Sequence, residues 1–151
     1  MRNGELVTIA CILGAGCSGG GGTGPTTSHQ MAGIWSYESR NLQDGHGTTC
    51  SGTGTAMTLT QHGATFSGQI EGGTLTCTYL GSSSSSNLGF GQVSAGTIDG
   101  DSVHFNIDGT SWRSWGTFAA ADSMGGMLNA IYVFGGSQLI LTGYWASRRQ
   151  P

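Results

Sequence analysis

The fold is decided by the stretch Thr55-Ala56-Met57-Thr58-Leu59-Thr60-Gln61-His62-Gly63-Ala64-Thr65-Phe66-Ser67-Gly68-Gln69-Ile70. In its first half threonine occupies one face and Met57 and Leu59 the other, because successive side chains of a strand point to opposite faces. His62-Gly63 then predicts a turn into a second strand, from Thr65 to Ile70. The stretch is therefore expected to form an antiparallel hairpin with one polar and one apolar face.

The same period of two, interrupted by turn residues, continues along the chain. Asp99-Gly100 predicts a hairpin, because this dipeptide between alternating runs favours a tight turn. Gly72-Gly73 is also expected to be a turn, and the serine run from Ser82 to Ser86 a loop. No segment has a sustained helical period. The expected strands are 33–38, 55–61, 65–70, 74–79, 92–98, 102–107, 112–120, 127–134 and 138–147.

The composition excludes several classes of protein. The chain has 151 residues, enough for one domain, of which 36% are hydrophobic and 9% charged. It is too apolar for a disordered chain, and its 29 glycines argue against helices, since each interior glycine costs about 1 kcal/mol relative to alanine. All five basic residues are arginines and the net charge is −3, so no nucleic-acid partner is expected.

A meander of this many strands leaves two open edges unless the sheet closes on itself. We therefore predict an all-β fold, an antiparallel meander of about eight to nine strands closed into a small up-and-down barrel. If Trp35 points into this barrel, the alternation places further side chains inside it. These are Tyr37, Met57, Leu59, Phe66, Ile70, Leu75, Tyr79, Val103, Phe105, Leu139, Leu141 and Trp145.

The first 17 residues are expected to be an export signal. Arg2 precedes a short apolar run, Leu6–Leu13, which is too short to span a bilayer but suits a signal peptide. The end of this segment, Leu13-Gly14-Ala15-Gly16-Cys17, resembles the lipobox of bacterial lipoproteins. The resemblance implies that Cys17 is lipidated and anchors the chain to a membrane of the bacterial cell envelope, with the domain in the periplasm or outside the cell. A soluble secreted protein cut nearby, or an apolar first strand, is the alternative.

Residues 18–30 are rich in glycine, serine and threonine, and are expected to be a flexible tether. The folded domain is then expected to span residues 31–151. If Cys11 is removed and Cys17 carries a lipid, Cys50 and Cys77 remain, and an even pair in an oxidising compartment is expected to form a disulfide. Such a bond contributes roughly 3 kcal/mol in the chain-entropy model. Two buried thiols, or a metal bound by Cys50 with His46, are the alternatives.

The two ends of the domain suggest a family. Gly33 and Trp35 form a Gly-x-Trp in the first strand, and Trp145 precedes Arg148 and Arg149 at the end of the last. This pairing resembles the calycin superfamily, the lipocalins and their relatives. The resemblance implies a lipocalin-like, eight-stranded barrel, often with a cup for a small apolar ligand, in which a basic residue packs over the tryptophan ring. We expect Arg148, rather than Arg149, to plug the barrel floor over Trp35. The alternative is a tryptophan that is simply core beside solvated arginines.

Neither a catalytic nor a metal-binding constellation can be assembled from the sequence. The four histidines are scattered, with His29 in the tether, and none lies in a nucleophile motif or metal-ligand cluster. Asp99 and Asp101 flank a hairpin glycine and lack the further oxygen ligands that calcium requires. No catalytic residue, metal or cofactor is therefore expected.

A small hydrophobic molecule is the expected partner of the barrel. The candidate ligand-binding residues are Tyr37, Gln61, Tyr79, Phe105 and Trp145. The sequence leaves open whether the interior is filled or contains a cup, since Gly68 and Gly143 either leave space or mark bends in the wall. The competing interpretation is a non-catalytic module with a packed barrel that contacts another protein. Its contact loops would be residues 40–53, 81–90 and 108–114.

Overall fold

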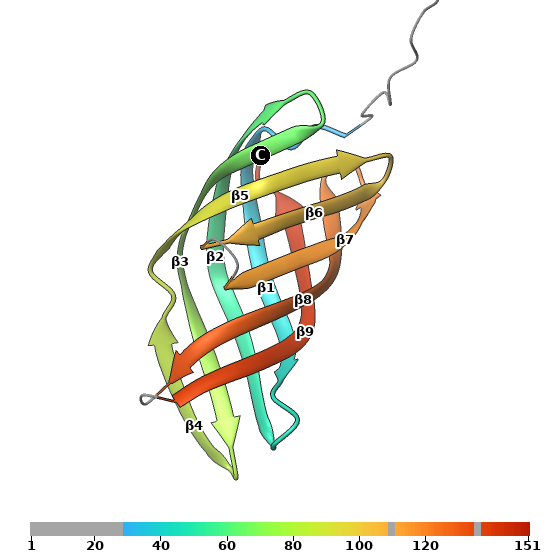
Figure 1. The fold of residues 1–151 in the computed structure, drawn as a ribbon. Coiled ribbons are helices and arrows are strands. Elements are labelled where there is room, and N and C mark those ends of the chain that lie inside the picture. Colours follow the sequence, from blue (N-terminus) through green and yellow to red (C-terminus); the bar gives the residue numbers. More distant parts are fainter. Residues whose placement is uncertain (1–28, 109–110, 135–136) are drawn as a thin grey trace, which may run out of the picture.

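The computed structural model describes residues 29–108, 111–134 and 137–151, which form nine strands and no helix. Eight of the strands close into an antiparallel barrel and the ninth, β4, lies outside it (Figure 1). The predicted all-β barrel is therefore confirmed. The strands are β1 (Gly33–Gln43), β2 (Thr48–His62), β3 (Thr65–Tyr79), β4 (Ser82–Asn87), β5 (Phe90–Asp99), β6 (Ser102–Ile107), β7 (Trp112–Ala120), β8 (Ser123–Phe134) and β9 (Ser137–Arg149).

The barrel closes where the first strand meets the last. β1 pairs with β2 on one side and with β9 on the other, where Trp35 lies opposite Arg149. Around the wall the order is β1, β2, β3, β5, β6, β7, β8 and β9, so each barrel strand pairs with its neighbours along the chain. This closure leaves the eight barrel strands without a continuous open edge, as the sequence argument required.

The glycine pair Gly72-Gly73 does not end a strand, so the turn predicted there is wrong. β3 runs through both glycines, at φ angles of +70° and +88°, as one strand of 15 residues. The pair marks where β3 changes partner: residues up to Glu71 pair with β5, and residues from Thr74 pair with β4. Glycine adopts positive φ without steric cost, which allows the strand to bend away from the barrel wall here.

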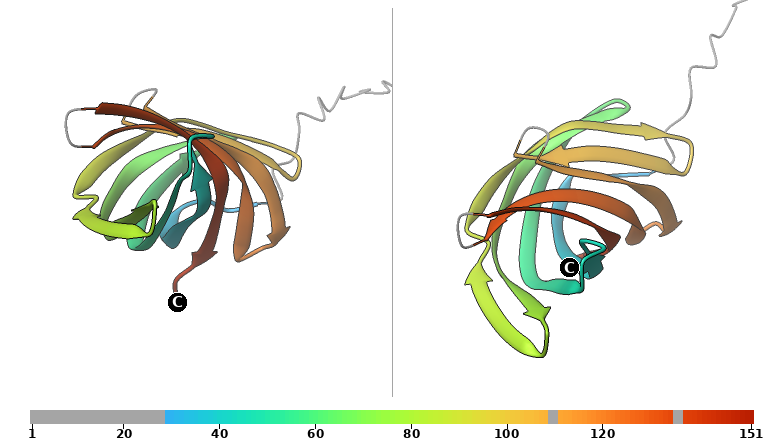
Figure 2. Two further views of the ribbon diagram at one scale, coloured as in Figure 1. Left: turned by 90° about the horizontal axis from the view of Figure 1, so that it is seen from below. Right: turned by 60° about the horizontal axis from the view of Figure 1, so that its bottom comes forward.

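The serine run predicted as a loop is instead strand β4, which is a further correction. β4 pairs with the end of β3, and the two form a flap, residues 74–87, that stands away from the curved wall (Figure 2). Beyond Gly73 one edge of β3 still pairs with β2, but the edge that β5 occupies up to Glu71 is free, so its backbone groups bond to β4. Hydroxyl pairs add to this ladder, with Thr76 bonded to Ser85 and Thr78 to Ser83, each at 2.8 Å.

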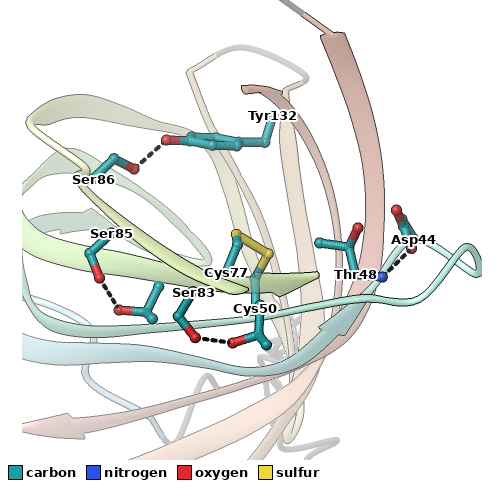
Figure 3. The surroundings of a disulfide bond; sticks show 10 residues. Asp44, Thr48, Cys50, Cys77, Ser83, Ser85, Ser86 and Tyr132 are labelled. Atoms are coloured by element: carbon teal, nitrogen blue, oxygen red, sulfur yellow. Dashed lines mark hydrogen bonds between the residues drawn. A yellow bond between two sulfur atoms is a disulfide. The ribbon is translucent and has the colours of Figure 1, made fainter. Parts of the chain in front are cut away.

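The predicted disulfide between Cys50 and Cys77 is confirmed. The two cysteines are direct partners in the β2–β3 ladder, and both are buried. Figure 3 shows the bond close to the hydroxyl pairs that join β3 to β4, and Cys77 lies opposite Ser84 midway along the flap. The disulfide therefore links the two longest strands where they extend from the barrel.

At the neighbouring β1–β2 turn, hydrogen bonds from Thr48 and from the backbone of His46 lower the pKa of Asp44.

Gly68 and Gly143, which were expected either to leave space or to mark bends, both lie at irregularities of the wall: Gly68 is at a register shift in the β3–β5 pairing, and Gly143 is opposite a register shift in β1. A Cβ at Gly68 would lie 2.0 Å from the carbonyl oxygen of Thr58, and one at Gly143 would lie 2.7 Å from that of Asn41. The cross-strand pair Gly116 and Gly126 is equally tight, at 2.1 Å from the nearest backbone oxygen in each case. These positions therefore fill the wall instead of opening a cup.

Cys17, the signal segment 1–17 and most of the tether lie outside the described residues. His29, assigned to the tether, is described, and it packs on the barrel: its ring stacks on that of Phe118 with centroids 3.9 Å apart. Its Nε2 also lies 2.7 Å from a carboxylate oxygen of Asp101. His29 therefore belongs with the folded domain. A helix with the length and hydropathy needed to span a bilayer is absent from residues 29–108, 111–134 and 137–151.

Candidate ligand pocket at the barrel mouth

One end of the barrel, the closed end, is formed by Met31, Trp35, Phe118 and Arg149. Trp35 is fully buried, and its indole N–H donates to the carbonyl oxygen of Met31 at 2.9 Å. The guanidinium carbon of Arg149 lies 5.1 Å from the centre of the indole ring, within the range of a cation–π contact. The expectation that Arg148 packs over Trp35 is wrong, because the Arg148 side chain is exposed. Neighbouring residues of a strand point to opposite faces, so Arg149 faces Trp35 and Arg148 faces away from it.

The closed end is completed by the segment that leads into β1. Gln61 was a candidate ligand residue, but its side-chain oxygen accepts the backbone N–H of Met31, and its amide donates to the carbonyl of His29 at 3.3 Å. The same amide donates to the carbonyl of Gly63 at 2.8 Å. Gln61 therefore fastens the entering chain to β2 at the end of the barrel that Trp35 closes.

Above this floor the interior is filled by aromatic side chains. The ring of Tyr37 stacks on Trp145 at 5.9 Å, and Phe105 meets Trp145 edge to face at 5.1 Å. Phe66 packs on Phe105 at 5.9 Å. All four are at most 4% exposed. The middle of the barrel is therefore a packed core.

Tyr37 also places a polar group at the top of this core. Its hydroxyl and that of Ser114 lie 3.2 Å apart and are hydrogen bonded. Burial raises the pKa of the Tyr37 phenol well above its ordinary value, although the bond to Ser114 opposes the shift. Tyr37 is therefore a neutral, fixed side chain at the boundary between the core and the space above it.

A pocket of about 260 Å³ lies at the mouth of the barrel, where β3 leaves the wall. Its base consists of Tyr37, Thr55, Ile70 and Ile107, which are all at most 7% exposed. Its rim comes from three separate segments of chain: the loop into β5, the β6–β7 turn and β8. The rim side chains with the largest apolar groups are Leu88, Phe90, Trp112, Ile131 and Tyr132.

Three polar features mark this pocket. The hydroxyl of Thr55 is buried and has no hydrogen-bond partner among the described residues. Asp108 stands at the rim, where its carboxylate accepts the backbone N–H of Gln92 at 3.0 Å. Across the mouth, the hydroxyl of Tyr132 on β8 bonds to that of Ser86 in the flap (Figure 3). The pocket thus has an apolar wall with a few placed polar groups, as ligand sites commonly do.

The structure brings only part of the predicted site together. Tyr37 lines the pocket, whereas Phe105 and Trp145 lie in the packed core below it. Tyr79 was expected inside but is 51% exposed at the tip of the flap, because β3 extends past the barrel. Leu139 is half-buried, and the rest of the predicted interior is buried. Those residues are Met57, Leu59, Phe66, Ile70, Leu75, Val103, Phe105, Leu141 and Trp145.

The residues that sequence reasoning missed are Thr55, Leu88, Phe90, Asp108 and Tyr132. Several of them belong to segments 81–90 and 108–114, which were considered only as contact loops for another protein. The available signal was their composition, since Phe90 and Trp112 are large apolar residues beside turns. Sequence alone does not show that both segments meet over the same end of the barrel.

A second feature is an apolar surface on the outside of β8 and β9. Met127 faces Tyr144 across the ladder and Ile131 faces Ile140, and the exposed polar pair Asn129 and Thr142 lies between these two pairs on the same face. The two apolar pairs and Val133 are 40–66% exposed. We call these five apolar residues the outer stripe.

Neither metal-ligating side chains among the described residues nor the comparisons with known proteins add a further site. Among the described residues, His, Cys, Asp and Glu side chains do not gather into a group of three or more that could hold a metal ion. No family model matches the chain, and no match was found among curated proteins or solved structures.

Proposed function

We propose that this protein is an exported envelope lipoprotein whose lipocalin-like barrel binds a small hydrophobic molecule at its mouth. The observation that carries the proposal is the pocket of about 260 Å³, with its buried base and rim of large apolar side chains. Ligand sites usually measure ~300 Å³ or more, so this volume favours a small ligand. The floor formed by Trp35 and Arg149 agrees with the calycin resemblance of the sequence.

Export and anchoring are supported by features outside and inside the barrel. The segment ending at Cys17 is similar to a lipobox, and a buried disulfide suits an oxidising compartment. His29 lies at the closed end, so a tether attached there leaves the mouth accessible. Labelled palmitate should be incorporated by cells that express the full chain and not by cells that express Cys17→Ser. Equal labelling of both chains would exclude Cys17 as the lipidated residue.

Ligand binding is tested with a neutral apolar probe, N-phenyl-1-naphthylamine, whose fluorescence rises in an apolar site. The full chain should bind it, and Trp112→Ala should weaken binding, because Trp112 lines the pocket. Trp115→Ala is the matched control, since Trp115 lies on the same strand but is not among the lining residues. Native mass spectrometry of the purified chain should show a co-purified small molecule. No probe binding, or equal loss in both variants, would contradict the proposal.

The outer stripe supports a second candidate, a non-catalytic protein-interaction or structural module of the envelope. Clusters of exposed apolar side chains are a feature of surfaces that bind other proteins, and the outer stripe has two such cross-strand pairs. Ile140 is 66% exposed on this stripe and does not line the mouth pocket. If this candidate is correct, Ile140→Asp removes a crosslinked complex formed in cells, while probe binding at the mouth stays unchanged.

A further inference from the structure

We propose that the mouth pocket selects a small amine: its protonated amino group pairs with Asp108, and its aromatic or apolar body lies against the rim. This inference rests on the proposed ligand-binding function and names the class of ligand.

Asp108 supplies the charge. Among the described residues that line the pocket, it is the single ionisable group with a full charge at neutral pH. The ion pairs in the described part of the chain are His29–Asp101 and Arg40–Glu38, so Asp108 has no arginine beside it there. A carboxylate at the edge of an apolar pocket attracts a cation and repels an anion, and the net charge of −3 acts in the same direction.

The position of this carboxylate is set by the backbone. The N–H of Asp108 donates to the carbonyl of Gln92 at 2.9 Å, while the Asp108 carboxylate accepts the N–H of Gln92 at 3.0 Å. Gly91 leaves the room that this arrangement needs, because a Cβ there would lie 2.9 Å from both carboxylate oxygens. The charge is therefore held in one place at the rim rather than on a free surface side chain.

The walls suit a cation with an apolar body. Aromatic rings of Tyr37, Phe90, Trp112 and Tyr132 line the pocket. A protonated amine is attracted both to the faces of such rings and to the Asp108 carboxylate, whereas a carboxylate on the ligand is attracted to neither. A pocket of about 260 Å³ restricts the ligand to a small molecule.

Thr55 does not contribute a contact to the ligand. The residue is only 5% exposed at the base of the pocket, and its hydroxyl oxygen has almost no accessible surface. A ligand in the pocket therefore does not reach this oxygen, and the pocket selects on the charge and on the apolar body.

The test compares three probes that differ by one group: tyramine, with an amine and a hydroxyl, phenethylamine, with the amine alone, and 4-ethylphenol, with the hydroxyl alone. Each is titrated into the full chain by calorimetry and by displacement of N-phenyl-1-naphthylamine. Tyramine should bind about tenfold or more tightly than 4-ethylphenol, since a charge-assisted hydrogen bond contributes that much. Asp108→Asn should remove this preference.

Two features make Asp108→Asn a specific test of the negative charge. Asp108 has a φ of +50°, which asparagine also adopts, and the amide oxygen can still accept the N–H of Gln92. Asp99→Asn is the control, because it removes one negative charge at the β5–β6 hairpin, away from the pocket. The control should keep the preference for tyramine.

The outcomes separate the inference from the function on which it rests. If N-phenyl-1-naphthylamine does not bind, the proposed function fails. If it binds, but amines bind no more tightly than 4-ethylphenol or Asp108→Asn leaves their preference intact, the pocket binds apolar molecules and the amine inference is overturned.

Discussion

Arg149 lies over Trp35, with its guanidinium carbon 5.1 Å from the ring centre, and the two residues are also direct partners between β9 and β1. The guanidinium donates to the carbonyl of Gln30 as well. One side chain thus joins the last strand, the first strand and the entering segment at the point where the barrel closes.

Arg149→Ala should therefore lower the free energy of unfolding by about 0.5–2 kcal/mol, the usual range for a cation–π contact. Arg148→Ala is the control, because Arg148 is exposed on the opposite face of β9 and should change stability little. Urea denaturation of both variants measures the difference. Equal losses would show that the pairing with Trp35 contributes nothing specific.

The disulfide should stabilise the barrel through the unfolded state. Cys50 and Cys77 are 27 residues apart, and a loop of that length predicts about 3–4 kcal/mol in the chain-entropy model. The double variant Cys50→Ala/Cys77→Ala should unfold at correspondingly lower urea concentration. Reductant should destabilise the wild type and leave the double variant unchanged, and sensitivity of both would point to another cysteine.

Stability should fall in alkali because of Tyr37. Burial holds the pKa of its phenol well above the ordinary value, so the folded protein keeps a proton that the unfolded chain loses above pH ~10. The folded state then binds more protons than the unfolded state, and the free energy of unfolding decreases as pH rises.

Tyr37→Phe removes this ionisation. It should cost about 1 kcal/mol at neutral pH, because the bond to Ser114 is lost. Above pH ~10 the difference in the free energy of unfolding between the wild type and Tyr37→Phe should narrow by up to about 1.4 kcal/mol per pH unit. Urea denaturation between pH 8 and 11 measures both slopes, and parallel slopes would contradict the assignment.

The flap should be held to β8 mainly by the bond between Ser86 and Tyr132. Ser86→Ala or Tyr132→Phe should speed amide hydrogen exchange in β4 while global stability changes little, since β4 pairs with β3 alone. Ser84→Ala is a suitable control, because Ser84 is exposed on the same strand. Unchanged exchange in the first two variants would mean that the β3–β4 ladder alone holds the flap.

The close approach of β7 and β8 should not tolerate a methyl group. Gly126→Ala would place a Cβ 2.1 Å from the carbonyl oxygen of Trp115 and 2.4 Å from the Cα of Gly116, so it should destabilise the fold by about 1–3 kcal/mol or more. Gly100→Asn is the control: its φ is +57°, nothing lies within 4 Å, and asparagine accepts this conformation. Thermal denaturation of the two variants should differ clearly.

Local patterns in the sequence were sufficient for most of the strands and for most of their buried faces. Alternation predicted that Met57 and Leu59 are inside, and the turns after His62 and Asp99 join paired strands as expected. These features depend on residues close together in the chain, where side chains of a strand alternate with a period of two. The disulfide was also predictable, from the number of cysteines and the compartment.

The tertiary structure decided the features that depend on pairing between distant segments. Alternation leaves open which of Arg148 and Arg149 faces Trp35, because that depends on the register of β9 against β1. The serine run became a strand because the end of β3 had a free edge, which no local pattern records.

The mouth pocket illustrates the same distinction. Thr55, Asp108 and Tyr132 come from three strands or turns that are far apart in the sequence, and they meet only because the barrel closes. The sequence alone determined a β-barrel with an apolar interior, since burial and alternation are local properties of each strand. The location and polarity of the pocket depend on the register and tilt of all the strands together, so only the folded chain decided them.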